Sequence, residues 1–163
     1  MINKLRDVFR EKMFPVYMYG PTGVGKSFAS ALVYCRYGCG DPFFDAWFIR
    51  FSNLTDDMMT KSKAGMPTPW ERITRDRQLI VIDEIGSGAK NEWRNEILWE
   101  ILERRRGKPL ILTSNLTPDE LLTRFDARIQ SRIMQGSLIA LLGKDKRVEG
   151  LSEKRSFTIE VKT

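Results

Sequence analysis

The sequence predicts one α/β domain with a mainly parallel central sheet flanked by helices. Three observations carry this prediction. The chain has 163 residues, and domains usually contain about 100–150 residues. Short apolar runs, typical of buried strands, alternate with segments of helical periodicity. A glycine-rich turn separates the first apolar run from the first long helical segment.

The expected elements alternate between strand and helix. Apolar side chains at helical spacing predict an amphipathic helix within residues 1–14. Apolar or alternating runs predict strands over residues 15–19, 46–51, 78–82, 109–112, 138–142 and 157–161. Helical spacing predicts helices over residues 27–36, 55–63, 93–106 and 126–135, and a capping box at residues 117–120.

Charge and composition limit the classes of function. The chain carries 27 Lys and Arg residues against 21 Asp and Glu residues, a formal net charge of +6. This balance favours polyanionic partners, chiefly nucleic acid, although a basic solvated surface would give the same count. No histidine is present, which excludes Ser-His-Asp and Cys-His triads and zinc sites that need histidine.

Cysteine usage and the apolar runs indicate the compartment. Cys35 and Cys39 are the two cysteines, and we expect both to be reduced thiols. The apolar runs are far shorter than the roughly 18 residues of a membrane-spanning helix, and no secretory signal is visible. We therefore expect a cytoplasmic protein without a membrane partner, and a phage or mobile-element origin fits its size.

Residues 20–27 match the motif G-x-x-x-x-G-K-[ST] between a strand and a helix. The motif consists of Gly20, Pro21, Thr22, Gly23, Val24, Gly25, Lys26 and Ser27. Its glycines let successive backbone N–H groups face one anion, and the helix N-terminus adds the positive end of its dipole. We expect Lys26 to reach the β- and γ-phosphates of ATP and the Ser27 hydroxyl to ligate Mg²⁺. The motif predicts a P-loop NTPase.

Two carboxylates follow the buried strand at residues 78–82. Asp83 and Glu84 then lie at the carboxyl-terminal edge of the sheet, where ligands bind in open α/β folds. We expect Asp83 to hold Mg²⁺ through water. Glu84 is the candidate base that orients and deprotonates the attacking water, although it fits a surface acid at a strand end as well. The added glutamate favours hydrolysis of ATP over transfer to another substrate.

A polar tip and two arginines complete the candidate site. Asn115 follows an apolar strand, where it can bind the γ-phosphate or the water, or serve as a turn residue. Arg128 and Arg132 lie four apart on one helical face. An arginine that stabilises charge on the transferring γ-phosphoryl group is an arginine finger, and one supplied in trans makes hydrolysis depend on oligomerisation. An intramolecular ion-paired face explains the same spacing.

Five motifs occur in one order along the chain. They are residues 20–27, 82–86, 102–106, 113–116 and 127–132. In this order the chain resembles, over about residues 14–147, the AAA+ ATPases of the DnaC/DnaI helicase-loader and IstB transposition-helper group. The resemblance implies the AAA+ fold of the ASCE type without a C-terminal lid domain. We expect one domain over residues 1–163, with an N-terminal helix in 1–14, a nucleotide-binding core in 15–147 and a strand extension in 148–163.

The resemblance also implies roles for particular residues. Residues 20–27 would be Walker A, Asp83 and Glu84 Walker B, and Asn115 sensor 1. Arg132 would be the finger, with Arg128 as its neighbour, and Arg147 is a candidate phosphate sensor. Proteins of this group form ATP-dependent homo-oligomeric spirals or filaments, bind single-stranded DNA and deliver a replicative ring helicase. The helper members instead guide a transposase to target DNA.

Two further functions fit part of the pattern. Residues 20–27 and 113–115 also resemble superfamily 3 viral helicases, which translocate on DNA as hexamers. A nucleotide or small-molecule kinase would need an acceptor pocket and a lid. Candidate DNA contacts are basic or aromatic: Lys61, Lys63, Arg104, Arg105, Arg106, Lys108 and Trp70. The basic run also complements a helix C-terminus, and Trp93 and Trp99 fit a core position.

Overall fold

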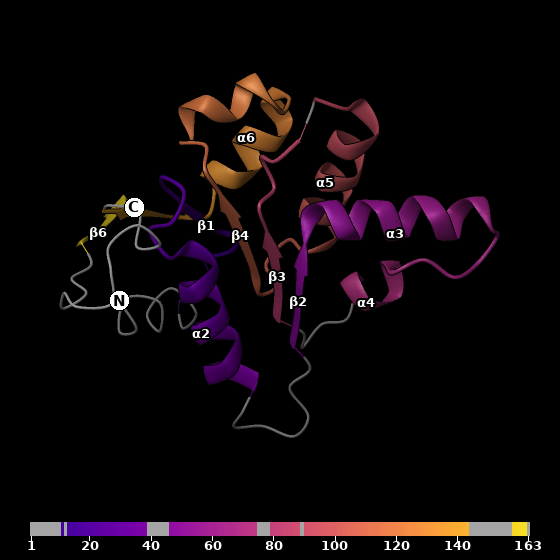
Figure 1. Cartoon of the computed structure of the whole chain (residues 1–163), viewed down its shortest axis with the longest axis horizontal. Coiled ribbons are helices and arrows are strands. Elements are labelled where there is room, and N and C mark those ends of the chain that lie inside the picture. The colour runs from indigo at the N-terminus through magenta and orange to yellow at the C-terminus, as the bar shows by residue number, and fades with distance from the viewer. Residues whose placement is uncertain are drawn as a thin grey trace.

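A computed structural model of the chain describes residues 11, 13–38, 46–74, 79–88, 90–143 and 158–162. The strands are β1 (Val16–Tyr19), β2 (Ala46–Arg50), β3 (Leu79–Asp83), β4 (Leu110–Ser114), β5 (Ser137–Leu142) and β6 (Thr158–Lys162). They form one sheet in the order β2-β3-β4-β1-β5-β6 (Figure 1). The first five strands pair in parallel, and β6 pairs antiparallel with β5. The predicted fold class is confirmed.

The helices connect these strands. They are α2 (Lys26–Gly38), α3 (Phe51–Lys63), α4 (Trp70–Thr74), α5 (Glu92–Arg104), the 3-10 turn η1 (Asp119–Thr123) and α6 (Ala127–Met134). Helix α3 begins directly after β2, before the expected start at residue 55, because Phe51 and Leu54 already lie in the core. Helix α4 was not expected, since its five residues are too few to show a helical period.

The predicted capping box forms, but it opens a 3-10 turn rather than an α-helix. The backbone N–H of Glu120 donates to Thr117 Oγ1 (3.3 Å), and the N–H of Thr117 donates to Glu120 Oε2 (2.8 Å). Two orphan donors are thereby satisfied reciprocally. The carboxylate bonds from Thr117 lower the pKa of Glu120 below its usual range.

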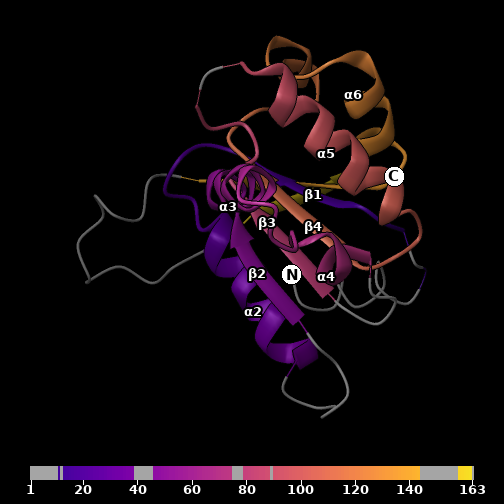
Figure 2. The same cartoon turned by 90° about the vertical axis from the view of Figure 1, so that its right-hand side faces the viewer.

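The sheet separates two apolar cores. Helix α2 covers one face, with Ala29 and Val33 against apolar side chains of β1, β3, β4 and β5. Helices α3, α4, α5 and α6 cover the other face and contribute the larger cluster, which includes Leu98 and Ile129. Figure 2 shows α2 on one side of the sheet and α5 and α6 on the other. Burial on both faces explains why β3 and β4 are continuous apolar runs.

Some expectations fall on residues outside the described ranges. The N-terminal helix expected within residues 1–14 does so except at residues 11, 13 and 14, and Arg147 and Cys39 also lie outside the described ranges. Cys35 is an exposed free thiol. Among the described residues, no helix has both the length and the apolar character needed to cross a membrane.

The turn between α6 and β5 depends on the small size of Gly136. A Cβ at this position would lie 1.9 Å from the carbonyl oxygen of Pro15. The same carbonyl accepts a hydrogen bond from the backbone N–H of Ser137 (3.0 Å), which starts the pairing of β5 with β1. The backbones are therefore too close for any side chain.

We expect Gly136→Ala to lower the free energy of unfolding by about 1–3 kcal/mol, because the overpacked contact is with backbone rather than with a flexible side chain. Urea denaturation measures it. Ser131→Ala, on the exposed surface of α6, is the control and should change stability by less than about 0.5 kcal/mol. Equal stability of the two variants would contradict the close approach.

Candidate active site

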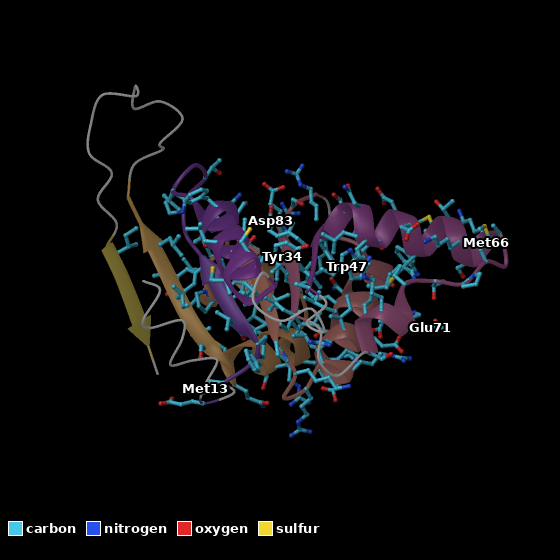
Figure 3. All side chains as sticks on the ribbon, turned by 90° about the horizontal axis from the view of Figure 1, so that it is seen from below. Met13, Tyr34, Trp47, Met66, Glu71 and Asp83 are labelled. Atoms are coloured by element: carbon cyan, nitrogen blue, oxygen red, sulfur yellow. The ribbon has the colours of Figure 1, made fainter. Side chains whose placement is uncertain are left out.

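The candidate site lies at the carboxyl-terminal edge of three neighbouring strands. The loop 20–27 follows β1, Asp83 ends β3, and Asn115 follows β4. Because these strands are parallel and adjacent in the order β3-β4-β1, their ends meet at one edge. In Figure 3, Asp83 and Met13 lie towards opposite ends of the sheet, since Met13 precedes β1.

The loop 20–27 turns tightly at its glycines. Gly23 and Gly25 have φ values of 80° and 99°, which only glycine adopts without steric cost. Val24 between them is 1% exposed and anchors the loop in the core of the α2 face. Pro21 and Thr22 are exposed at its tip. The loop is thus fixed at its base and open at its tip.

Lys26 lies inside the loop and connects it to β4. Its side chain is 7% exposed. The Nζ group donates to the carbonyl oxygens of Gly20 and Pro21 and to Asn115 Oδ1, each at 2.7 Å. The structure therefore brings the expected lysine and the expected sensor residue into direct contact.

Asp83 accepts hydrogen bonds from two hydroxyl groups. Ser27 Oγ lies 2.9 and 3.0 Å from its two carboxylate oxygens, and Thr113 Oγ1 donates to Oδ1 at 2.5 Å. Asp83 is 4% exposed, so these donors replace water. A carboxylate and a hydroxyl side by side are hard oxygen ligands, the kind that Mg²⁺ prefers. Ser27 and Asp83 thus fit a magnesium site.

Glu84 has a left-handed backbone, with φ at 59°. This region costs a residue with a side chain about 1–2 kcal/mol. Two hydrogen bonds to Thr113 compensate: the N–H of Glu84 donates to Thr113 Oγ1 and the N–H of Ile85 to the Thr113 carbonyl, both at 3.0 Å. The Glu84 carboxylate faces Arg50 at the end of β2, with Nε and Oε2 3.4 Å apart.

Hydrogen bonds of Ser114 and Leu116, the two neighbours of Asn115, hold the turn that carries it. The N–H of Leu116 donates to Ser114 Oγ (3.1 Å), and the Tyr17 hydroxyl donates to the carbonyl of Leu116 (2.7 Å). A tyrosine hydroxyl is already protonated at neutral pH, and burial raises the pKa of Tyr17 further above its ordinary value, so this hydroxyl remains a donor in alkaline solution too. The turn that carries Asn115 is therefore bound to β1, the strand that leads into loop 20–27.

Arg128 and Arg132 are bound within the chain. Arg132 binds Glu103 of α5 through Nε and a terminal nitrogen, and a further nitrogen donates to Gln135. Arg128 binds Asp126 and Glu96, which raise the pKa of its guanidinium. Their guanidinium carbons lie 5.1 Å (Arg128) and 5.8 Å (Arg132) from the ring centre of Trp99.

These arginines make no contact with loop 20–27 among the described residues. The intramolecular ion-paired face, one of the two explanations of their spacing, is therefore present. A role in a neighbouring subunit stays a prediction.

The basic run after α5 has structural contacts. Arg105 is 1% exposed and donates to the carbonyls of Ile73 (3.2 Å) and Pro109 (2.6 Å). Lys108 donates to the carbonyl of Thr74 (2.9 Å), and Arg104 pairs with Glu100 and lies over the ring of Trp70. These side chains fix α4 against α5. Lys63, by contrast, is exposed at the end of α3.

Thr113, Arg50 and Tyr17 were missed as functional residues. Thr113 lies in the polar tip that the sequence shows after β4, and Arg50 lies at a strand end on the same edge as Asp83. Both positions are signals in the sequence, but their partners depend on the strand order. Tyr17 lies within the apolar run of β1, and no feature of the sequence indicates its hydrogen bond.

The sequence-family model of the bacterial DnaA ATPase domain matches residues 3–140 of the chain. The chain belongs to this family. The replicative helicase loader DnaI of Bacillus subtilis is 26% identical in an alignment that covers 81% of this chain and 47% of DnaI. The chain therefore spans about half of that relative.

Solved structures confirm the AAA+ fold. The DnaC helicase loader has a TM-score of 0.69 at 18% identity, over 85% of this chain and 88% of that one. The replication initiator DnaA bound to AMPPCP and single-stranded DNA has a TM-score of 0.70 at 19% identity, over 85% of this chain and 46% of that one. The expected resemblance to the helicase loaders is confirmed, and the family match adds the initiator DnaA.

We expect Lys26→Ala to abolish nucleotide binding, because the variant loses the only ammonium within the loop and its three hydrogen bonds. Titration with a fluorescent ATP analogue measures binding. Lys63→Ala, which removes an exposed lysine distant in sequence from the loop, is the control. Tight binding by Lys26→Ala would remove this lysine from the site.

Proposed function

We propose that the chain binds and hydrolyses ATP as an AAA+ subunit of DNA replication, and that it loads a ring helicase on single-stranded DNA. The observation that carries the proposal is the meeting of Lys26, Ser27, Asp83 and Asn115 at one sheet edge. Membership of the bacterial DnaA ATPase domain family supports it, as does the likeness to the loader DnaI.

In the proposed complex, loop 20–27 binds the phosphates through its backbone N–H groups and the start of α2. Lys26 exchanges its carbonyl acceptors for phosphate oxygens, which are stronger partners for an ammonium group. Ser27 and Asp83 hold Mg²⁺, which when bound neutralises charge on the phosphate oxygens. Asn115 stays beside Lys26 and faces the γ-phosphate.

Glu84 is the proposed general base. Its backbone is left-handed, and its carboxylate pairs with Arg50 at the end of the neighbouring strand β2. The pair is largely exposed, so it is worth less than about 1 kcal/mol and yields easily. Once released, the carboxylate can accept a proton from the attacking water while Asn115 orients that water.

The finger is proposed to act between subunits. Arg132 contacts Glu103 and Gln135 but not its own loop. A second copy of the chain would then supply the guanidinium that stabilises charge on the γ-phosphoryl group. The solved DnaA complex with AMPPCP and single-stranded DNA supports single-stranded DNA as a partner, and the net charge of +6 agrees with a polyanionic partner.

We expect Glu84→Gln to bind ATP with nearly unchanged affinity but to hydrolyse it about 10²–10⁴-fold more slowly, because the amide cannot accept the proton. Single-turnover assays separate binding from chemistry. Glu100→Gln, an equal change of charge on α5 at a residue that pairs with Arg104, is a control that leaves the proposed base and the proposed finger intact. If Glu84→Gln hydrolyses ATP at the wild-type rate, Glu84 is not the general base.

The test of the whole proposal is ATP hydrolysis across a concentration series, with and without single-stranded DNA at fixed salt. We expect the rate per subunit to rise with concentration and with DNA. Arg132→Ala should bind ATP normally and hydrolyse it at least about tenfold more slowly, as loss of a finger does. Helicase loading is then measured with a replicative ring helicase.

Mixing two variants with impaired hydrolysis distinguishes a finger in trans from one in cis. Arg132→Ala keeps an intact loop, and Lys26→Ala keeps an intact finger. If the finger acts between subunits, the mixture recovers part of the activity. A mixture as inactive as its components, or a rate independent of concentration and DNA, would contradict the assembly and favour a self-contained switch.

A further inference from the structure

Thr113 holds three consecutive residues of the acidic segment. Its side chain lies in β4 and is 0% exposed. The hydroxyl donates to Asp83 Oδ1 (2.5 Å) and accepts from the N–H of Glu84 (3.0 Å), while the Thr113 carbonyl accepts from the N–H of Ile85 (3.0 Å). One hydroxyl thus donates to the side chain of Asp83 and accepts from the backbone of Glu84, two acids with different proposed roles.

We propose that Thr113 is the positioning residue for hydrolysis, which orients the Asp83 carboxylate and sets the backbone turn that directs Glu84. The inference rests on the proposed function of the site. Thr113 has no contact of its own with the reacting groups in this scheme. It acts through Asp83 and Glu84, and its effect on each can be measured separately.

The first part of the inference concerns Asp83. Two hydroxyl groups donate to its carboxylate, those of Ser27 and Thr113. Ser27 belongs to the loop that binds the phosphates and is itself a proposed Mg²⁺ ligand. Thr113 lies in the sheet, so its bond keeps the carboxylate oriented whatever Ser27 contacts. Without it, Ser27 is the one hydroxyl that donates to either oxygen of Asp83 among the described residues.

The second part concerns Glu84. A left-handed φ of 59° persists in a residue with a side chain only where neighbouring contacts enforce it. The two bonds from the N–H groups of Glu84 and Ile85 to Thr113 enforce it here. Loss of the hydroxyl removes one of them, and the left-handed turn can relax. The carboxylate then shifts relative to the γ-phosphate while the loop 20–27 stays intact.

Thr113→Val and Thr113→Ser form a matched pair, because valine keeps the shape and serine keeps the hydroxyl. We expect Thr113→Val to lower kcat for ATP about 10–100-fold with KM within about threefold of wild type. Thr113→Ser should keep kcat within about threefold of wild type, since its hydroxyl can make the same bonds. A Thr113→Val variant with wild-type kcat would overturn the proposal.

Thr55→Val controls for a purely structural loss. Thr55 is also 0% exposed, and its hydroxyl donates to the carbonyl of Ser52 (2.9 Å) within α3. We expect both valine variants to change Tm, but only Thr113→Val to lower kcat. If the two variants lower kcat equally, Thr113 is a stability residue and the proposal fails.

Two measurements separate the effect of Thr113 on Glu84 from its effect on Asp83. If Thr113 acts through Glu84, adding Thr113→Val to Glu84→Gln causes little further loss of kcat, whereas a full multiplicative loss overturns that route. If it acts through Asp83, Thr113→Val needs about 3–10-fold more Mg²⁺ for half-maximal binding of a fluorescent ATP analogue. An unchanged Mg²⁺ requirement overturns that second route.

The binding measurement separates this inference from the proposed function. A wild-type chain that binds the analogue with Mg²⁺ but does not hydrolyse ATP refutes the proposed ATPase activity. The Mg²⁺ requirement of Thr113→Val still decides whether Thr113 orients Asp83. A chain that binds no nucleotide overturns both.

Discussion

The carboxylate of Asp83 binds together three strands of the sheet. Asp83 is the last residue of β3. Its carboxylate accepts one hydrogen bond from Thr113 in β4 and others from Ser27, at the end of the loop that follows β1. A carboxylate that is 4% exposed is stable only with such donors, because transfer of an unpaired charge from water is very costly. The strand order β3-β4-β1 supplies both donors at one edge. The buried carboxylate therefore requires this strand order, and the strand order in turn places the residues of the site.

Glu84 is held differently from Asp83, and the difference suits two roles. Its backbone is fixed by Thr113, while among the described residues its carboxylate has one ion-pair partner, the largely exposed Arg50. A rigid backbone with a weakly held side chain allows a small movement of the carboxylate without refolding of the turn. Asp83 has the opposite arrangement, with a buried carboxylate fixed from two sides. An ion ligand needs such fixity, whereas a base must exchange partners.

The sequence predicted the sheet edge because each part of it is a local pattern. Three features are visible as local patterns in the sequence: loop 20–27, the two acids after one apolar run, and Asn115 after another. Parallel strands bring the three together at one edge. The start of α3 and the short α4 depend on tertiary burial of Phe51 and Ile73. The role of Thr113 depends on the pairing of β3 with β4, which single-sequence periodicity cannot give.

The two arginines show what spacing alone leaves open. Residues four apart on a helix share a face, but the partner of that face comes from α5, which supplies Trp99, Glu103 and Glu96. Arg132 is the more enclosed, with 15% of its side chain exposed. A finger that leaves Glu103 for a phosphate exchanges one anionic partner for another, so most of the electrostatic cost of departure is recovered on arrival. The carboxylate of Glu103 thus gives Arg132 a stable position within its own subunit and is compatible with the proposed action on a neighbour.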